Sequence, residues 1–75
     1  MILVCGATGL LGSRIVEHLI EAEQPVRAFV RPDTDASALQ ASGVAIARGD
    51  LRGPTSVRAA LAGVDTVVTS ANAIS

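Results

Sequence analysis

The chain has 75 residues, of which 49% are hydrophobic, and Phe29 is its one aromatic residue. Its formal net charge of −1 gives no electrostatic reason to expect a nucleic acid or an anionic membrane surface as a partner. No stretch reaches the roughly 18 consecutive apolar residues of a membrane span, and no signal peptide is indicated, so we expect no membrane association. The single cysteine, Cys5, has no partner for an internal disulfide, which favours a reducing, cytoplasmic location. One cysteine and one histidine also predict no metal site of thiolates and imidazoles.

The first element is an apolar run at residues 1–5, typical of a central parallel strand buried on both faces. Gly6, Gly9 and Gly12 follow it, and residues 11–23 predict an amphipathic helix. Gly6 lets the chain turn sharply off the strand, and Gly9, which has no Cβ, lets an anion approach the backbone. The free N–H groups at the helix start favour that anion, so the junction predicts a pyrophosphate site. The alternative is a glycine turn used only for packing.

The remaining pattern predicts, in order, a strand at 26–30, a helix at 34–42, a strand at 44–48, a helix that starts at Pro54 and ends at Gly63, and a strand at 65–69. Alternating strands and helices with short crossovers predict an α/β fold of three layers. We expect a doubly wound parallel sheet of the Rossmann type with strand order 3-2-1-4. Such folds usually have more strands than four. We therefore expect residues 1–75 to be the N-terminal part of a dinucleotide-binding domain, completed by a further domain or by a second copy of the chain.

Arg31 follows the second strand, at the place where many NAD-binding proteins of this fold carry an acidic residue for the ribose hydroxyls. A guanidinium suits a phosphate, so Arg31 favours NADP over NAD. Asp33 lies two residues further on and keeps NAD open as the alternative. A solvated arginine at a strand end is the other interpretation.

Two further segments follow the third and fourth strands. Asp50 is predicted to accept a hydrogen bond from the adenine amino group, with Leu51 against the ring; a turn or capping aspartate is an equally open interpretation. Three small residues follow the fourth strand: Ser70, Ala71 and Asn72. They are predicted to leave room for the nicotinamide ribose, and an ordinary loop is the alternative interpretation.

Four segments resemble the NmrA-like, atypical branch of the short-chain dehydrogenase/reductase superfamily: 6–12, 26–31, 43–44 together with 49–51, and 60–65. The resemblance covers the N-terminal part of that fold. It implies NADP or NAD binding through Gly6, Thr8, Gly9, Leu10, Leu11 and Gly12, with adenosine-side contacts from Arg31, Asp50 and Leu51. The superfamily's catalytic Tyr-x-x-x-Lys has no counterpart, since the chain contains neither tyrosine nor lysine. We therefore predict no catalytic residue within it.

Together these observations favour the cofactor-binding segment of an NADP-dependent oxidoreductase that acts on a small carbonyl or a quinone. The absence of the tyrosine–lysine pair favours an alternative, a non-catalytic dinucleotide-binding redox sensor. The expected partners are the dinucleotide and, for an enzyme, a small-molecule substrate.

Overall fold

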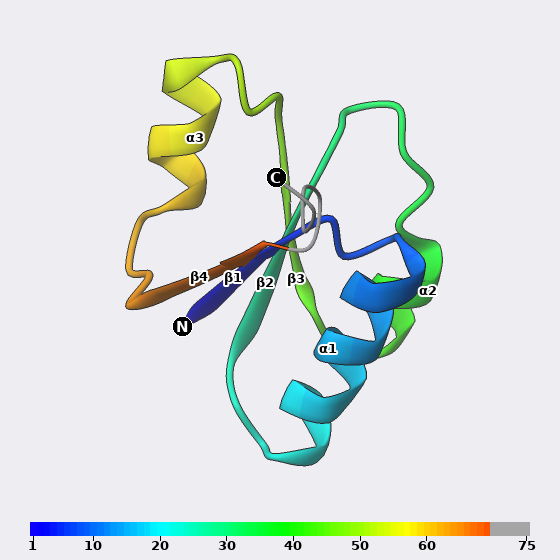
Figure 1. The fold of residues 1–75 in the computed structure, drawn as a ribbon. Coiled ribbons are helices and arrows are strands. Elements are labelled where there is room, and N and C mark those ends of the chain that lie inside the picture. Colours follow the sequence, from blue (N-terminus) through cyan, green and yellow to red (C-terminus); the bar gives the residue numbers. More distant parts are fainter. Residues whose placement is uncertain (70–75) are drawn as a thin grey trace.

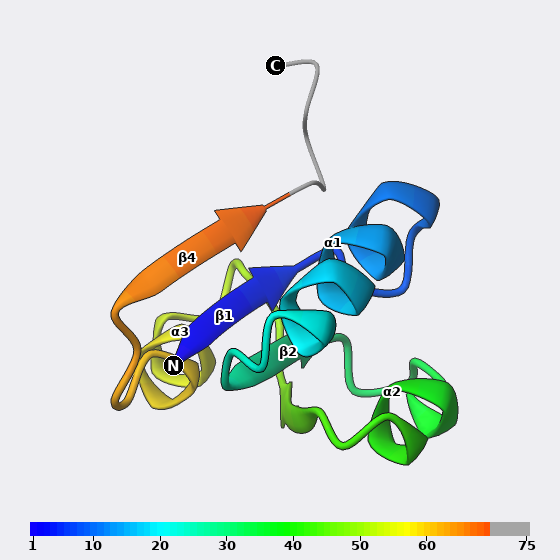
Figure 2. The ribbon, with the colours of Figure 1, turned by 90° about the horizontal axis from the view of Figure 1, so that it is seen from below.

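The computed structural model describes residues 1–69, in which strands and helices alternate along the chain. The elements are β1 (Ile2–Cys5), α1 (Leu10–Glu21), β2 (Val26–Val30), α2 (Ser37–Ala41), β3 (Ala45–Arg48), α3 (Pro54–Ala60) and β4 (Thr66–Thr69). All strand pairs are parallel, and the order β3-β2-β1-β4 confirms the predicted sheet (Figure 1). Figure 2 shows β1 between β4 and β2. None of the helices in this described part is long and apolar enough to cross a membrane.

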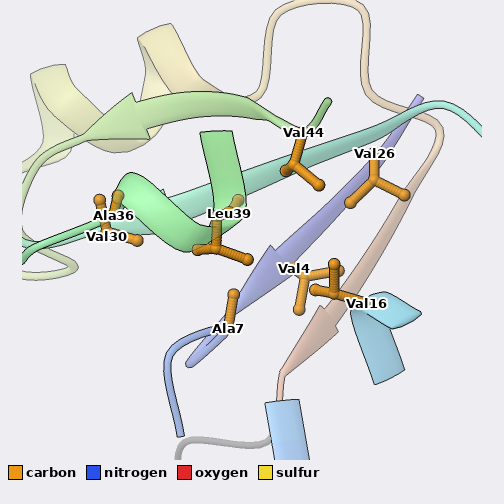
Figure 3. Close-up of a cluster of buried hydrophobic side chains, with 9 residues drawn as sticks. Val4, Ala7, Val16, Val26, Val30, Ala36, Leu39 and Val44 are labelled. Carbon is orange, nitrogen blue, oxygen red and sulfur yellow. The ribbon is translucent and has the colours of Figure 1, made fainter. Parts of the chain in front are cut away.

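The sheet is covered on both faces, with α1 and α2 on one side and α3 on the other (Figure 1). Successive residues of β1 point to opposite faces, and each face has its own buried cluster. Val4 packs on one side with Val16 of α1 and Leu39 of α2 (Figure 3). Leu3 and Cys5 belong to the other cluster, beneath α3. This burial on both faces confirms the interpretation of residues 1–5 as a central strand.

Helix α1 starts one residue earlier and ends two residues earlier than the apolar pattern predicted. Gly6 has φ +78°, the left-handed conformation that the sharp turn after β1 requires. At the other end, the Gln24 amide donates to the Leu19 carbonyl at 3.0 Å and the Glu23 amide to the Ile20 carbonyl at 2.9 Å. These two bonds, with Glu23 at φ 59°, close the helix before Pro25 is reached.

Helix α2 is much shorter than the predicted span of 34–42. The Asp35 carboxylate accepts hydrogen bonds from the Ser37 amide at 3.0 Å and the Ser37 hydroxyl at 2.7 Å, which fixes the start of the helix there. Residues 31–34 form a turn instead, closed by the Thr34 amide donating to the Arg31 carbonyl at 3.1 Å. The helix ends at Ala41, one residue before the predicted end, and Gly43 follows it with φ +86°.

Helix α3 begins at Pro54 as predicted, but it ends at Ala60, before Gly63. An arginine of β2 holds its far end. Arg27 Nη1 donates to the Ala60 carbonyl at 2.6 Å and to the Ala62 carbonyl at 2.7 Å. A cation at a helix C-terminus is favourable because the last carbonyls lack partners within the helix. Leu61, an apolar residue directly after the helix, is 40% exposed.

Candidate functional site

A pocket of about 250 Å³ opens where β1, β2 and β3 end at their carboxyl termini. In doubly wound sheets this is the side on which ligands bind. The pocket is lined by Cys5, Gly6, Thr8, Phe29, Val30, Arg31, Thr34, Gly49, Asp50 and Leu51. Five predicted site residues are therefore brought together from three separate parts of the chain: Gly6, Thr8, Arg31, Asp50 and Leu51.

Beside this pocket, the first turn of α1 presents unused backbone donors. No group within residues 1–69 accepts a hydrogen bond from the N–H of Leu10, Leu11 or Gly12. The cap residue, Gly9, supplies no side chain, and the first turn contains no acidic residue that would compete with a bound anion. The positive end of the α1 dipole is therefore open to an anionic group.

The side chains of this turn are mostly exposed. Leu10 is 78% and Leu11 54% exposed, although both are apolar. The Ser13 hydroxyl donates to the Leu10 carbonyl at 3.0 Å, so its hydroxyl hydrogen is used within the helix. In contrast, Gly12 is buried, as is Val16 one turn further along α1.

Arg31 is exposed and its guanidinium makes no hydrogen bond with residues 1–69. It lies at the pocket wall directly after β2, where the sequence predicted a phosphate-binding arginine. Its charge also acts on Asp50, although that effect is the weakest of those on this carboxyl group. The structure thus leaves the Arg31 donors available to an anion at the pocket.

Asp50 is held by a neighbour that the sequence analysis missed. Arg52 donates from Nη2 to Oδ2 at 2.8 Å and from Nε to Oδ1 at 3.1 Å, and its amide donates to Oδ1 at 2.8 Å. These hydrogen bonds hold the pKa of Asp50 well below its usual range. Because the folded pKa is the lower one, the pair stabilises the turn above about pH 4 and loses this effect in acid.

The two interpretations of Asp50 are compatible in this geometry. The residue forms a turn, since its side chain accepts the Arg52 amide and its carbonyl accepts the Gly53 amide at 2.8 Å. Oδ1 already accepts two hydrogen bonds from Arg52, whereas Oδ2 accepts one and has room for a second, so a contact of Oδ2 with an adenine amino group stays a prediction. Leu51 is 60% exposed at the pocket wall, and its packing against the ring also stays a prediction.

The turn after β3 is shaped by a buried glycine and a serine that the sequence analysis did not single out. Ser56 Oγ lies 3.2 Å from the Asp50 amide, 3.0 Å from the Asp50 carbonyl oxygen and 2.9 Å from the Gly53 carbonyl oxygen. Gly49 packs so closely on Ser56 that no Cβ fits between them. The remaining predicted residues lie outside the described part of the chain: Ser70, Ala71 and Asn72.

A parallel sheet of order 3-2-1-4, with a glycine turn after β1 and a pocket at the strand ends, is the arrangement of Rossmann-type nucleotide-binding proteins. More specifically, the chain belongs to the NmrA-like family, whose model matches residues 1–75.

Similar proteins agree with this assignment. The chain is 52% identical over 67 residues to the NAD(P)H azoreductase of Xenophilus azovorans, covering 89% of this chain and 23% of that protein. The structure of the Citrobacter sp. triphenylmethane reductase complexed with NADP(H) matches with a TM-score of 0.77 and 40% identity, over 88% of this chain and 24% of the reductase. That of the Escherichia coli NADPH-dependent quinone oxidoreductase complexed with NADPH has a TM-score of 0.84 and 32% identity, over 92% and 25%. The chain therefore spans about a quarter of the length of these relatives.

Proposed function

We propose that this chain forms the cofactor-binding part of an NADPH-dependent reductase of small carbonyls or quinones. The observation that carries the proposal lies at the carboxyl end of the sheet. There the first amides of α1 and the Arg31 guanidinium come close to one pocket, and neither makes a hydrogen bond with residues 1–69. Relatives named as an NAD(P)H azoreductase and an NADPH-dependent quinone oxidoreductase support it. When bound, NADPH would supply the hydride for the reduction.

The residues present fit such a cofactor. The amides of Leu10, Leu11 and Gly12 suit the pyrophosphate, because they stand at the positive end of a helix and have no acceptor in the part of the chain that the structure describes. The pocket bounded by Asp50 and Leu51 suits the adenosine end, with one polar and one apolar wall.

Arg31 is assigned to the 2′-phosphate, which distinguishes NADPH from NADH. Asp33, which kept NAD open as the alternative, is exposed and is not one of the residues that line the pocket. An NADPH preference is therefore the expectation for the full-length protein.

The Arg31→Met variant tests this assignment. We expect it to weaken NADPH binding by about 30-fold and NADH binding by less than about threefold, since a charged hydrogen-bonding partner of the 2′-phosphate is lost. The dissociation constants are measured by fluorescence titration of the full-length protein with each dinucleotide.

Arg58→Met is the matched control, because Arg58 is an exposed arginine of α3 outside the pocket wall. It removes the same charge and should leave both affinities within about twofold, since screening weakens charges that lie at a distance. The assignment of Arg31 is wrong if the unmodified protein does not prefer NADPH, or if Arg31→Met weakens both dinucleotides equally.

The redox sensor is the second candidate, and it is favoured by the lack of tyrosine and lysine in this chain. A single-turnover experiment separates the two functions. The full-length protein loaded with NADPH is mixed with a quinone, and the loss of reduced nicotinamide absorbance is followed. We expect oxidation that requires the protein; tight NADPH binding with no oxidation by quinones or small carbonyls would instead support the sensor.

A further inference from the structure

Arg48, the last residue of β3, reaches across to the loop that follows β2. Its Nη1 lies 2.8 Å from the Thr34 carbonyl oxygen and 3.2 Å from the carbonyl oxygens of both Arg31 and Pro32. The register of the sheet makes this possible, because Arg48 is paired with Val30 at the end of β2. Arg48 Nη1 therefore contacts three carbonyl groups of residues 31–34, the loop that contains Arg31.

Among residues 1–69, few other contacts hold this loop. Arg31, Pro32 and Asp33 are exposed, and one backbone hydrogen bond closes the turn, from the Thr34 amide to the Arg31 carbonyl. An unrestrained loop must lose conformational entropy when it orders on a ligand, and that loss weakens binding. Because Arg48 already holds the carbonyl groups of this loop before a ligand arrives, most of that entropy loss does not have to occur on binding.

We propose that Arg48 is a positioning residue that sets the preference for NADPH by holding the Arg31 loop, an inference that rests on the proposed role of Arg31. Arg48 is not among the residues that line the pocket, whereas Arg31 and Thr34 are. Arg48 therefore acts through the backbone of residues 31–34 and does not itself bind the phosphate.

The first experiment compares Arg48→Met and Arg48→Lys in the full-length protein, again by titration with NADPH and NADH. Arg48→Met should lower the preference for NADPH by about fivefold, the scale of one net hydrogen bond. Arg48→Lys should restore about half of the lost preference on a logarithmic scale, because an ammonium group can donate to several carbonyls but lacks the planar shape of the guanidinium. Arg58→Met should change nothing.

The second experiment asks whether Arg48 acts through Arg31. In the Arg31→Met background, adding Arg48→Met should cause no further loss of preference, since nothing remains for Arg48 to position. Without any dinucleotide, Arg48→Met should also increase hydrogen exchange at the amide of Thr34, whose acceptor is the Arg31 carbonyl.

The outcomes separate the two proposals. If Arg31→Met abolishes the preference and Arg48→Met leaves it intact, the positioning role is wrong and the proposed function stands. A further loss in the double variant means that Arg48 binds the phosphate directly, which also overturns positioning. If Arg31→Met has no selective effect, the assignment of Arg31 to the 2′-phosphate fails. Unchanged hydrogen exchange at Thr34 in Arg48→Met would independently refute the proposal that Arg48 holds the loop.

If Arg48→Met folds poorly, the unmodified protein is compared with Arg48→Lys instead. An NADPH preference that is no higher with arginine than with lysine at position 48 would then refute the proposal.

Discussion

Replacing Gly9 by valine is expected to weaken dinucleotide binding by at least about 100-fold while the fold persists. Gly9 has φ −76° and ψ 170°, a conformation that any residue adopts, so the backbone is not strained by a side chain. A Cβ there would lie 3.4 Å from the Gly6 carbonyl oxygen, an ordinary contact. The valine methyl groups would instead stand beside the free amides of α1, where a phosphate must approach.

Fluorescence titration with NADPH and unfolding in urea measure the two effects separately. Gly9→Ala should give an intermediate affinity, because it adds one carbon. Gly6→Ala provides the contrast: Gly6 has φ +78°, so alanine costs about 1–2 kcal/mol of stability through backbone strain. Unchanged affinity in a well-folded Gly9→Val protein would show that the start of α1 does not bind the pyrophosphate.

Gly49→Ala is expected to lower the free energy of unfolding by at least about 2 kcal/mol, because the site is already closely packed. A Cβ on Gly49 would overlap with Ser56 Cβ and would lie 3.1 Å from Phe29 Cζ. Relieving that clash displaces Ser56, whose hydroxyl group binds both backbone groups of Asp50. The substitution should therefore also weaken NADPH binding, since the pocket wall moves.

Gly53→Ala is the matched control in the same turn. Its Cβ would lie 3.3 Å from Ser56 Oγ and 3.4 Å from the Asp50 carbonyl oxygen, contacts that a small shift accommodates. We expect a loss of less than about 1 kcal/mol, mostly from the change of helix cap. Equal losses in the two variants, measured by urea unfolding, would contradict the packing argument for Gly49.

The sheet was predictable because each strand carries a short apolar run and each crossover is brief. Parallel strands with right-handed crossovers leave few arrangements, and the order β3-β2-β1-β4 is the one observed. The helix ends were less predictable. Helix α1 is followed by Glu23 in the left-handed conformation. Glutamate seldom adopts this conformation, so the end of α1 could not be predicted from the residues around it.

The candidate site was predictable where a residue follows a strand directly. Arg31 and Asp50 each come one or two residues after a strand, and parallel strands bring their ends together, so both reach one pocket. The turn at residues 31–34, which delays the start of α2, was not predictable in this way. The segment before it is held by Arg48, a contact between residues 14 to 17 positions apart that leaves no periodic signal. The two side-chain hydrogen bonds from Arg52 to Asp50 join residues only two positions apart. The Asp-x-Arg spacing was therefore an available signal for this pair.

The walls of the pocket come from three strand ends that are far apart in the chain, so they separate completely when the chain unfolds. A ligand that binds only the assembled walls must raise the melting temperature, and at 100 times its dissociation constant it adds about 2.7 kcal/mol of stability. A thermal-shift series with NADPH, NADH and their adenosine halves would therefore rank the dinucleotides before any electron acceptor is known.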